Sequence, residues 1–255
     1  MAWHTVAFEE AVTALNTDEQ LDAVADPVVP RQDGRYIWPL DRGQQRILGA
    51  YVGGASLTRA RLVIPTNQIT RFAGIVPLGS ALLPGTDPNV ADFRDFPITI
   101  QPETEIELRT GNDLAMGTEQ HDAILHVAGM EHSLGIPAGE RSILRCTAAI
   151  TATANAWSAE GALTFDETLD TGRFAVIGAQ GQGTTLIAFR LVFPNQLLRP
   201  GFIGMADVQN RGPMLNYGGL GVAGIFHSFA RPQLQVFCSA ADTAQVIWLM
   251  VVRVG

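Results

Sequence analysis

The sequence predicts an all-β protein made of two similar β-sandwiches in tandem, and three observations predict it. Short segments rich in Val, Ile, Phe and Thr alternate with Gly, Pro, Asn and Asp along most of the chain. One such segment occurs twice, at an offset of 129 residues, which is close to half of the 255 residues. Hydrophobic residues make up 47% of the chain and charged residues only 16%, which indicates a large surface buried in a core, in an oligomer interface or in both.

The predicted strands are short and punctuated by turn residues. Polar and apolar residues alternate in Glu105–Arg109, which is typical of a strand with one face in water. In contrast, Val246–Val252 is apolar throughout, which predicts a strand covered on both faces, either by layers of the same chain or by another subunit. Ten segments carry a strand pattern: Ile47–Val52, Ala60–Ile64, Ile98–Ile100, Glu105–Arg109, Ala123–Val127, Ile143–Ala154, Phe174–Ile177, Thr185–Phe193, Gln233–Phe237 and Val246–Val254.

One segment near the N-terminus fits a short helix. Phe8, Val12 and Leu15 recur at partial helical spacing, which predicts a helix over residues 7–25. The same residues also fit a strand over Val6–Leu15, so both interpretations stay open.

The internal repeat is the most informative feature. Arg61–Gln68 resembles Arg190–Gln196, and each contains an Arg-Leu-Val block that leads into a proline, which is expected to end a strand. Five weaker matches follow in the same order: Ala11–Ala14 with Ala149–Ala152, Gly34–Tyr36 with Gly172–Phe174, Phe93–Phe96 with Phe226–Phe229, Glu105–Arg109 with Gln233–Phe237, and Ala123–Val127 with Val246–Val254. The segment Met130–Arg141 has the Gly and Pro content of a linker, so we predict two domains, 1–131 and 132–255.

Two tandem β-sandwiches of this size resemble the double jelly-roll major capsid proteins of icosahedral viruses. The resemblance covers almost the whole chain and rests on this architecture and on the repeated Arg-Leu-Val-(Ile/Phe)-Pro block. It implies two jelly rolls, a homotrimer that forms a pseudo-hexagonal capsomer, and contacts with neighbouring capsomers and with minor capsid or vertex proteins. The chain has no lysine but many Ala, Gly and Arg residues, which favours a bacterial or archaeal virus, with the protein located in the virion after assembly in the host cytoplasm.

The charge pattern argues against strong direct binding of nucleic acid. Acids outnumber bases 25 to 17, which gives a formal net charge of −8. The first 33 residues hold seven acids and a single base, Arg31, where many coat proteins that hold their genome directly carry a basic arm. The resemblance then implies packaging through other proteins or over an internal membrane.

Targeting signals are not evident in the sequence. The first ten residues lack a basic region and already contain acids, so we expect no signal peptide. The longest strongly apolar run, Val246–Val252, is too short to cross a bilayer. Cys146 and Cys238 lie in apolar stretches and are expected to be buried thiols without an assigned role.

Glycine-rich motifs give little indication of a cofactor. Gly219–Gly224 matches Gly-x-Gly-x-x-Gly, but no strand precedes it and no helix follows, so we interpret it as a loop. Gly178–Gly183 is interpreted as a turn between two strands, and it lacks the lysine of a phosphate-binding loop.

The histidines and two carboxylate pairs are the candidate catalytic or metal-binding groups. His121 and His126 are five residues apart, which places them on opposite faces of a strand. A cupin-like metal site would have to use His121, Glu131 and His132, but the chain has no His-x-His pair. Two acid pairs are interpreted as solvated groups: Asp92 with Asp95, and Glu103 with Glu105.

These observations predict a structural protein rather than an enzyme. We expect no catalytic residue, no cofactor, no metal and no small-molecule substrate. Two alternatives stay open: a trimeric phage fibre or lectin-like carbohydrate-binding module, and, less favoured by the histidine spacing, a metalloenzyme with two cupin domains.

Overall fold

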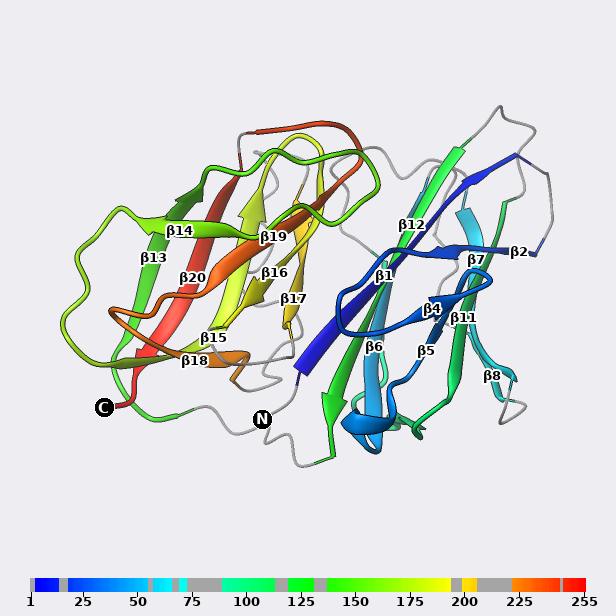
Figure 1. Cartoon of the computed structure of the whole chain (residues 1–255), viewed down its shortest axis with the longest axis horizontal. Helices are drawn as coiled ribbons and strands as arrows, with labels where there is room; N and C mark the ends of the chain where they lie inside the picture. Colours follow the sequence, from blue (N-terminus) through cyan, green and yellow to red (C-terminus); the bar gives the residue numbers. More distant parts are fainter. Residues whose placement is uncertain are drawn as a thin grey trace. The chain divides into compact units, whose positions relative to one another are not determined.

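The computed structural model describes residues 3–13, 18–54, 57–65, 69–72, 89–112, 119–130, 137–193, 199–205, 222–243 and 245–255. Contacts within the chain divide it into two compact units (Figure 1). The N-terminal unit is Thr5–Met130, and the C-terminal unit is Glu131–Gly255 together with Met1–His4.

The N-terminal unit is built from two antiparallel sheets. Its elements are β1 (Trp3–Val12), β2 (Glu19–Gln20), β3 (Asp22–Ala23), β4 (Arg31–Gln32), β5 (Arg35–Ile37), the 3-10 turn η1 (Leu40–Arg42), β6 (Gln45–Gly54), β7 (Leu57–Ile64), β8 (Ile69–Phe72), β9 (Asn89–Asp92), β10 (Ile98–Ile100), β11 (Glu105–Asn112) and β12 (Glu119–Gly129). The first sheet has the order β10-β6-β12-β1-β3, and the second has the order β4-β5-β11-β7-β8.

The core of this unit lies between its two sheets. It combines buried side chains of β1, β6 and β12 from the first sheet with those of β5, β7 and β11 from the second. Tyr36 fixes one side of the core, because its ring packs edge-on against Phe8 at 5.0 Å and its hydroxyl lies 2.6 Å and 2.5 Å from the carbonyl oxygens of Ala7 and Val24. This polar tip therefore connects three segments that are distant in sequence.

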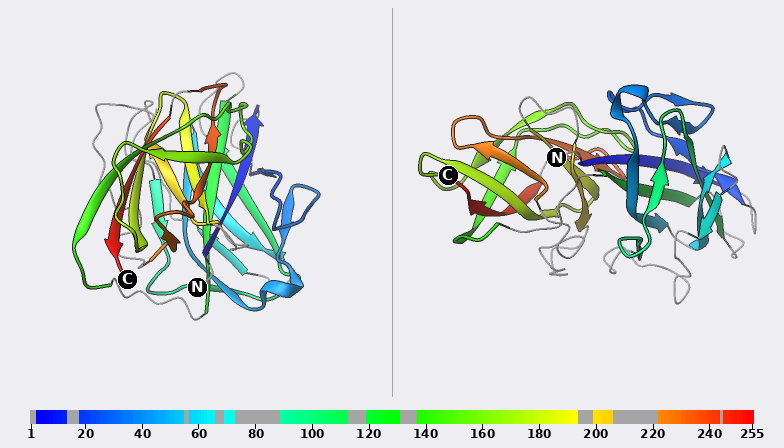
Figure 2. Two further views of the ribbon diagram at one scale, coloured as in Figure 1. Left: turned by 60° about the vertical axis from the view of Figure 1, so that its left-hand side comes forward. Right: turned by 90° about the horizontal axis from the view of Figure 1, so that it is seen from below.

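The C-terminal unit forms one continuous set of strands. Its elements are β13 (Arg141–Ala148), β14 (Gly161–Phe165), β15 (Arg173–Gln182), β16 (Leu186–Val192), β17 (Gly201–Met205), β18 (Gly224–His227), β19 (Gln233–Cys238) and β20 (Val246–Arg253). They follow the order β17-β16-β19-β14-β13-β20-β15-β18, and β17 also pairs with β15. Strand β14 joins two four-stranded halves, which fold over each other (Figure 2).

Both units have the same strand order. The N-terminal unit contains β10-β6-β12-β1 and β5-β11-β7-β8, and the C-terminal unit contains β18-β15-β20-β13 and β14-β19-β16-β17. If the eight main strands of each unit are counted along the chain, the first sheet contains strands 6, 3, 8 and 1, and the second contains strands 2, 7, 4 and 5. The predicted all-β fold is confirmed, and this order is consistent with a jelly roll of two four-stranded sheets.

Two β-bulges occupy equivalent positions in the two units. In the β6–β12 pair the register skips Leu48, and in the β15–β20 pair it skips Ile177. In the β7–β11 pair it skips Thr58, and in the β16–β19 pair it skips Ile187. Both pairs of bulges are offset by 129 residues, which is also the offset of the Arg-Leu-Val blocks. A bulge needs an extra residue at one defined point of a ladder, so the shared positions fix the alignment of the two units.

The Arg-Leu-Val repeat lies where a duplication requires it. Arg61 belongs to β7 and Arg190 to β16, and these strands have equivalent neighbours. Strand β7 ends at Ile64, directly before Pro65, as predicted. Pro194 lies outside the described residues.

Three of the weaker sequence matches pair residues that do not occupy equivalent positions in the two units. Gly34–Tyr36 enters β5, whereas Gly172–Phe174 enters β15, whose counterpart is β6. Phe93–Phe96 precedes β10, whereas Phe226–Phe229 spans the end of its counterpart β18. For the strands β11 and β19, the pairing partners align Arg109 with Gln235 rather than with Phe237, a shift of two residues.

The helix predicted over residues 7–25 is wrong, and the alternative strand is observed. Val6, Phe8 and Val12 are fully buried in β1, on the side of the core. A spacing of four residues is even, so it fits one face of a strand as well as one turn of a helix. The turn η1 is a short 3-10 helix, and in the part of the chain that the structure describes no helix is long and apolar enough to span a membrane.

Within this chain Val246–Val252 is fully buried on one face only, so the expected cover of its other face by another subunit stays a prediction. Ile247, Leu249 and Val251 are fully buried, whereas Val246, Trp248 and Met250 are partly buried. The inner face of β20 therefore packs in the core, and its outer face is partly covered, with Met250 packed against the buried cluster of Ala175, Ile177, Val222 and Val252.

Candidate functional site

A charged ladder crosses the outer face of the second sheet of the N-terminal unit. Strand β11 turns Ile106 and Leu108 into the core, where both are fully buried. Because side chains alternate along a strand, Glu105, Glu107 and Arg109 lie on the opposite face. The alternation that marked this segment as a strand thus also places three charges in one row.

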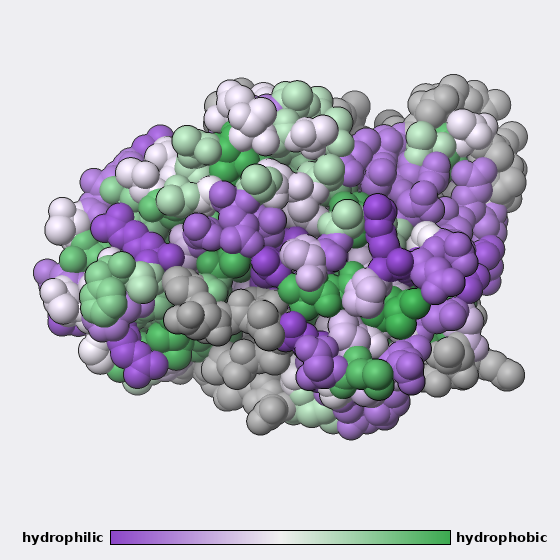
Figure 3. Space-filling model, in the orientation of Figure 1, coloured by the Kyte–Doolittle hydropathy of each residue, from purple (hydrophilic) through white to green (hydrophobic). Residues whose placement is uncertain are grey.

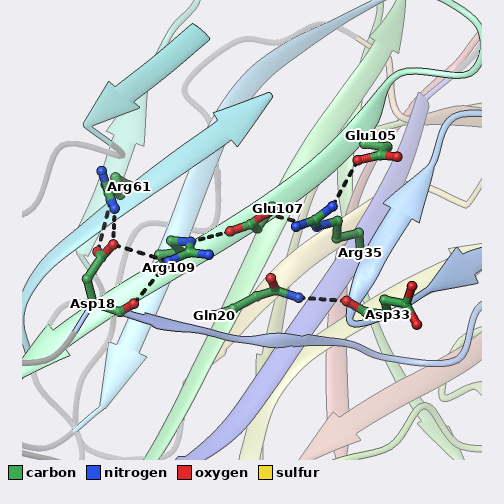
Figure 4. Close-up of polar contacts among 8 residues, drawn as sticks. All are labelled: Asp18, Gln20, Asp33, Arg35, Arg61, Glu105, Glu107 and Arg109. Atoms are coloured by element: carbon green, nitrogen blue, oxygen red, sulfur yellow. Dashed lines mark hydrogen bonds and ion pairs between the residues drawn. The ribbon is translucent and has the colours of Figure 1, made fainter. Parts of the chain in front are cut away.

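Glu107 lies at the centre of the ladder and is only 2% exposed. Its carboxylate pairs with Arg109 on one side and with Arg35 of β5 on the other, where Oε2 lies 2.9 Å from Nε (Figure 4). Arg35 continues to Glu105, with Nη1 3.1 Å from Oε2. Two guanidinium groups therefore compensate for the cost of burying this carboxylate.

Asp18 resolves a conflict at the other end of the ladder. Arg61 of β7 stands directly opposite Arg109 of β11 in the register, and like charges in that position destabilise a sheet. The carboxylate of Asp18 accepts a hydrogen bond from Nε of Arg61 at 2.9 Å and pairs with Nη1 of Arg109 at 3.5 Å (Figure 4). Asp18 precedes β2, so this bridge connects the edge of the sheet to its centre.

The ladder is electrically balanced, with three carboxylates and three guanidinium groups. Hydrophilic residues also gather on the surface over β2, β4 and β5 (Figure 3). Beside the β4–β5 hairpin, Nε2 of Gln20 donates to the carbonyl oxygen of Asp33 at 2.8 Å. Chemically, this arrangement holds neighbouring strands together, and each of its carboxylates is paired with a guanidinium group.

A shallow hollow beside the same hairpin has a volume of about 180 Å³. Ligand pockets usually exceed about 300 Å³. The lining residues are Asp22, Ala23, Arg31, Gln32, Asp33 and Gly34. The hollow therefore gives no support to a small-molecule site.

In the C-terminal unit the equivalent arginine, Arg190, contacts a glutamine and a tryptophan side chain. Arg190, the counterpart of Arg61, is fully buried. Its Nε donates to Oε1 of Gln235 at 2.9 Å, and Nε2 of Gln235 donates to the carbonyl oxygen of Ser158 at 2.9 Å. The guanidinium also lies 4.1 Å from the ring centroid of Trp157, so a cation–π contact takes the place of the carboxylate.

A buried carboxyl group lies on the other sheet of the N-terminal unit. Asp122 of β12 is only 8% exposed, and this burial raises its pKa to about 7, with a smaller contribution from the charge of Glu9. Gln120 lies between them, and its Nε2 donates to Oε2 of Glu9 at 2.8 Å. Burial and the charge of Asp122 also raise the pKa of Tyr51 above its usual value. Asp122 is therefore expected to titrate near neutral pH.

His121 and His126 are both fully buried in the N-terminal unit. Nδ1 of His121 lies 2.8 Å from Oγ1 of Thr110, and both side chains are fully buried. His126 is fully buried as well, which lowers its pKa to about 3 and keeps it neutral. Glu131 and His132, the other members of the cupin-like set, lie outside the described residues. No group of three or more His, Cys, Asp or Glu side chains that could hold a metal occurs in the described part of the chain.

One of the two glycine motifs lies in a strand, and part of the other lies outside the described residues. The prediction of a turn over Gly178–Gly183 is wrong, because β15 continues to Gln182. The small side chains are needed there: a Cβ on Gly181 would lie 2.6 Å from a ring carbon of Phe189. Residues 219–221 of the other motif lie outside the described residues, and Gly224 begins β18.

Two of the four acids predicted to be solvated, Asp92 and Glu105, pair with arginine side chains. Nε of Arg94 lies 2.8 Å from both carboxylate oxygens of Asp92, and these hydrogen bonds lower the pKa of Asp92. Asp95 and Glu103 are exposed, whereas Glu105 belongs to the ladder.

Both cysteines are buried and free, in agreement with the sequence-based expectation. Burial raises the pKa of the Cys146 thiol to about 12 and that of Cys238 to about 11, so both are protonated at neutral pH.

Comparison with solved structures gives a weak structural likeness. No protein-family model matches the chain, and no curated protein matches it. A solved structure, the major capsid protein P2 from bacteriophage PM2, aligns over 99% of this chain and 98% of its own, with 9% identity and a TM-score of 0.22. A score of this size decides neither fold nor function.

Proposed function

We propose that the chain is a double jelly-roll major capsid protein whose homotrimer forms the pseudo-hexagonal capsomer of an icosahedral virus. The observation that carries the proposal is the duplication: two consecutive units share one strand order and two equivalent bulges. Jelly rolls are a common fold of viral capsid domains.

The duplication supports the assembly through symmetry. Three copies of a chain with two similar units provide six similar building blocks around a three-fold axis. Such a ring can contact six neighbours, which is what a closed shell with hexagonal packing requires. In this proposal the chain acts through geometry rather than catalysis, and its partners are copies of itself, neighbouring capsomers and minor capsid or vertex proteins.

The charge distribution supports an indirect relation to the genome. In the ladder each arginine side chain has a carboxylate partner, so this face offers no surplus of positive charge to phosphate groups. We therefore propose packaging through other proteins or over an internal membrane, within a virion that assembles in the host cytoplasm.

Light scattering behind a sizing column tests the proposal. A homotrimer gives a mass of three times 27.4 kDa. A monomer or dimer at every concentration would contradict the proposal, and it would favour the carbohydrate-binding alternative, which a glycan array then tests.

A further inference from the structure

A short segment of the N-terminal unit crosses from one of its sheets to the other. We define the β2–β3 strap as residues 18–23. Its strand β2 pairs with β11 of the second sheet, and its strand β3 pairs with β1 of the first sheet. Between these two strands, Leu21 is fully buried in the core. The strap therefore connects the two sheets over one side of that core.

The backbone of the strap is held over a short length only. Strands β2 and β3 have two residues each. The N–H of Leu21 donates to the carbonyl oxygen of Leu108 at 2.8 Å, and the N–H of Ala23 donates to that of Gly34 at 3.0 Å. Short segments of this kind open locally at a lower free energy than the central strands of a sheet. A side-chain anchor at one end therefore has a large effect on whether the strap stays closed.

Asp18 is this anchor, and water reaches its ion pairs. Its carboxylate pairs with Arg61 and Arg109 (Figure 4). The three side chains are 26%, 35% and 32% exposed, in the order Asp18, Arg61 and Arg109. Salt screens exposed ion pairs, and the screening length falls from about 10 Å at 0.1 M ionic strength to about 3 Å at 1 M. High ionic strength therefore weakens the anchor.

The C-terminal unit has a segment at the equivalent place. Glu19 of the strap pairs with Thr110 of β11. In the C-terminal unit, the N–H of Ser158 donates to the carbonyl oxygen of Val236 in β19 at 2.9 Å. Thr110 and Val236 are equivalent, because each follows the residue that stands opposite the repeated arginine. Glu19 and Ser158 therefore occupy equivalent positions.

The residues directly before these two, Asp18 and Trp157, contact equivalent arginines by different means. Asp18 forms an ion pair with Arg61. Trp157 lies against Arg190, with 4.1 Å between the guanidinium and the ring centroid, and Arg190 is fully buried. Salt screens a buried contact much less than an exposed one. The same position thus holds a salt-sensitive anchor in one unit and a protected anchor in the other.

We propose that the β2–β3 strap is a salt-sensitive latch, which opens at high ionic strength while the equivalent segment of the C-terminal unit stays closed. Opening leaves unpaired backbone groups on β1 and β11, and such an edge can pair with an extended segment of another chain. The latch does not depend on the proposed function, because Asp18, Arg61 and Arg109 all belong to the N-terminal unit.

Amide hydrogen exchange at two salt concentrations tests the latch. The amides of Leu21 and Ala23 report on the strap, and those of Asn155 and Ser158 are the internal control, since each donates to a backbone carbonyl. We expect the first pair to exchange roughly fivefold or more faster in about 1 M than in about 0.05 M sodium chloride, and the second pair to change by less than about twofold. Light scattering selects a protein concentration at which the mass is the same at both salt concentrations.

A variant identifies the anchor. Asp18→Asn removes the charge and nearly keeps the size of the side chain, so its strap is expected to exchange at the fast rate already at low salt, without further acceleration at high salt. Asp92→Asn is the matched control, because Asp92 pairs with Arg94 in the same unit but outside the strap, and it is expected to keep the salt response of the unchanged protein.

Three results overturn the latch. One is a strap that exchanges at the same rate at both salt concentrations, and another is an equal acceleration in both units, which would indicate a global loss of stability. The third is a folded Asp18→Asn variant that keeps the salt response. The first two are measured on the unchanged protein, so they decide even where the variant does not fold. Acceleration confined to the strap supports the latch in a monomer and in a trimer alike, so the proposed function is decided separately by mass.

Discussion

The side chains of the charged ladder are expected to contribute very differently to the free energy of unfolding, depending on how deeply each is buried. Glu107 is almost fully buried between two arginines, whereas Glu105 at the end of the ladder is 38% exposed. Water can hydrogen-bond an arginine that loses an exposed carboxylate partner, but it cannot reach one that loses a buried carboxylate partner.

We predict that Glu107→Gln lowers the free energy of unfolding by about 1–3 kcal/mol, because it leaves Arg35 and Arg109 without their shared carboxylate. The matched variant Glu105→Gln is expected to cost about 0–1 kcal/mol, since water replaces its single ion pair. Urea denaturation of both variants measures the difference. Equal losses would mean that the position of Glu107 in the ladder carries no special weight.

Asp122 is expected to make stability depend on pH. Its pKa is raised from 3.8 to about 7 in the folded protein, so its contribution is complete below pH 3.8 and is lost as the pH rises to 7. His126 acts in the opposite direction: its pKa is lowered from 6.5 to about 3, so its contribution is lost as the pH falls below 6.5.

The variant Asp122→Asn separates these effects. We expect it to raise Tm at pH 8 by several degrees, at about 2–4 °C per kcal/mol, and to change Tm little at pH 4. Thermal melts between pH 4 and pH 8 follow both proteins. A constant difference across this range would show that Asp122 does not titrate there.

At the scale of elements, strands were predictable and their partners were not. All ten predicted segments contain an observed strand, because β-rich composition and turn residues are local signals. The prediction of a helix over residues 7–25 was wrong because the four-residue spacing of Phe8 and Val12 fits both a helix and one face of a strand. The ladder escaped prediction because it joins residues up to 91 positions apart, and only the register brings Asp18 to Arg109.

A better alignment of the repeat was present in the sequence. Leu40-Asp41-Arg42-Gly43 and Leu169-Asp170-Thr171-Gly172 share the offset of 129, as do Gly49-Ala50 and Gly178-Ala179. These pairs would have fixed the register of β6 and β15 and excluded the match of Gly34–Tyr36 with Gly172–Phe174. The extent to which the outer face of β20 is covered could not be predicted, because an apolar strand has the same sequence pattern whether its cover is its own chain or another.

The aligned cores contain a compensating exchange of volume. Val52 and Ala60 of the N-terminal unit correspond to Gly181 and Phe189 of the C-terminal unit. A Cβ on Gly181 would lie 2.6 Å from the ring of Phe189, so the glycine makes room for the ring. Each unit thus fills the same space with a different pair.

We predict that Gly181→Val destabilises the protein by about 1–3 kcal/mol through overpacking. The double variant Gly181→Val/Phe189→Ala reproduces the pair of the N-terminal unit and is expected to recover part of that loss. Chemical denaturation of both single variants and the double variant gives the coupling energy. Additive losses would contradict the proposed equivalence of the two cores.

At the scale of the whole molecule, the duplication is the property that the proposed function uses. Two units with one strand order, in three copies, give six similar blocks. The charged ladder of the N-terminal unit and the buried arginine network of the C-terminal unit stabilise each unit internally, which suits a protein proposed to act as a building block.

Negative-stain microscopy of purified protein, sorted by mass with light scattering, tests this account most directly. It predicts particles of three times 27.4 kDa with six similar lobes around a three-fold axis, and hexagonal sheets or closed shells at higher concentration. Two-lobed particles with the mass of one chain at every concentration would contradict it.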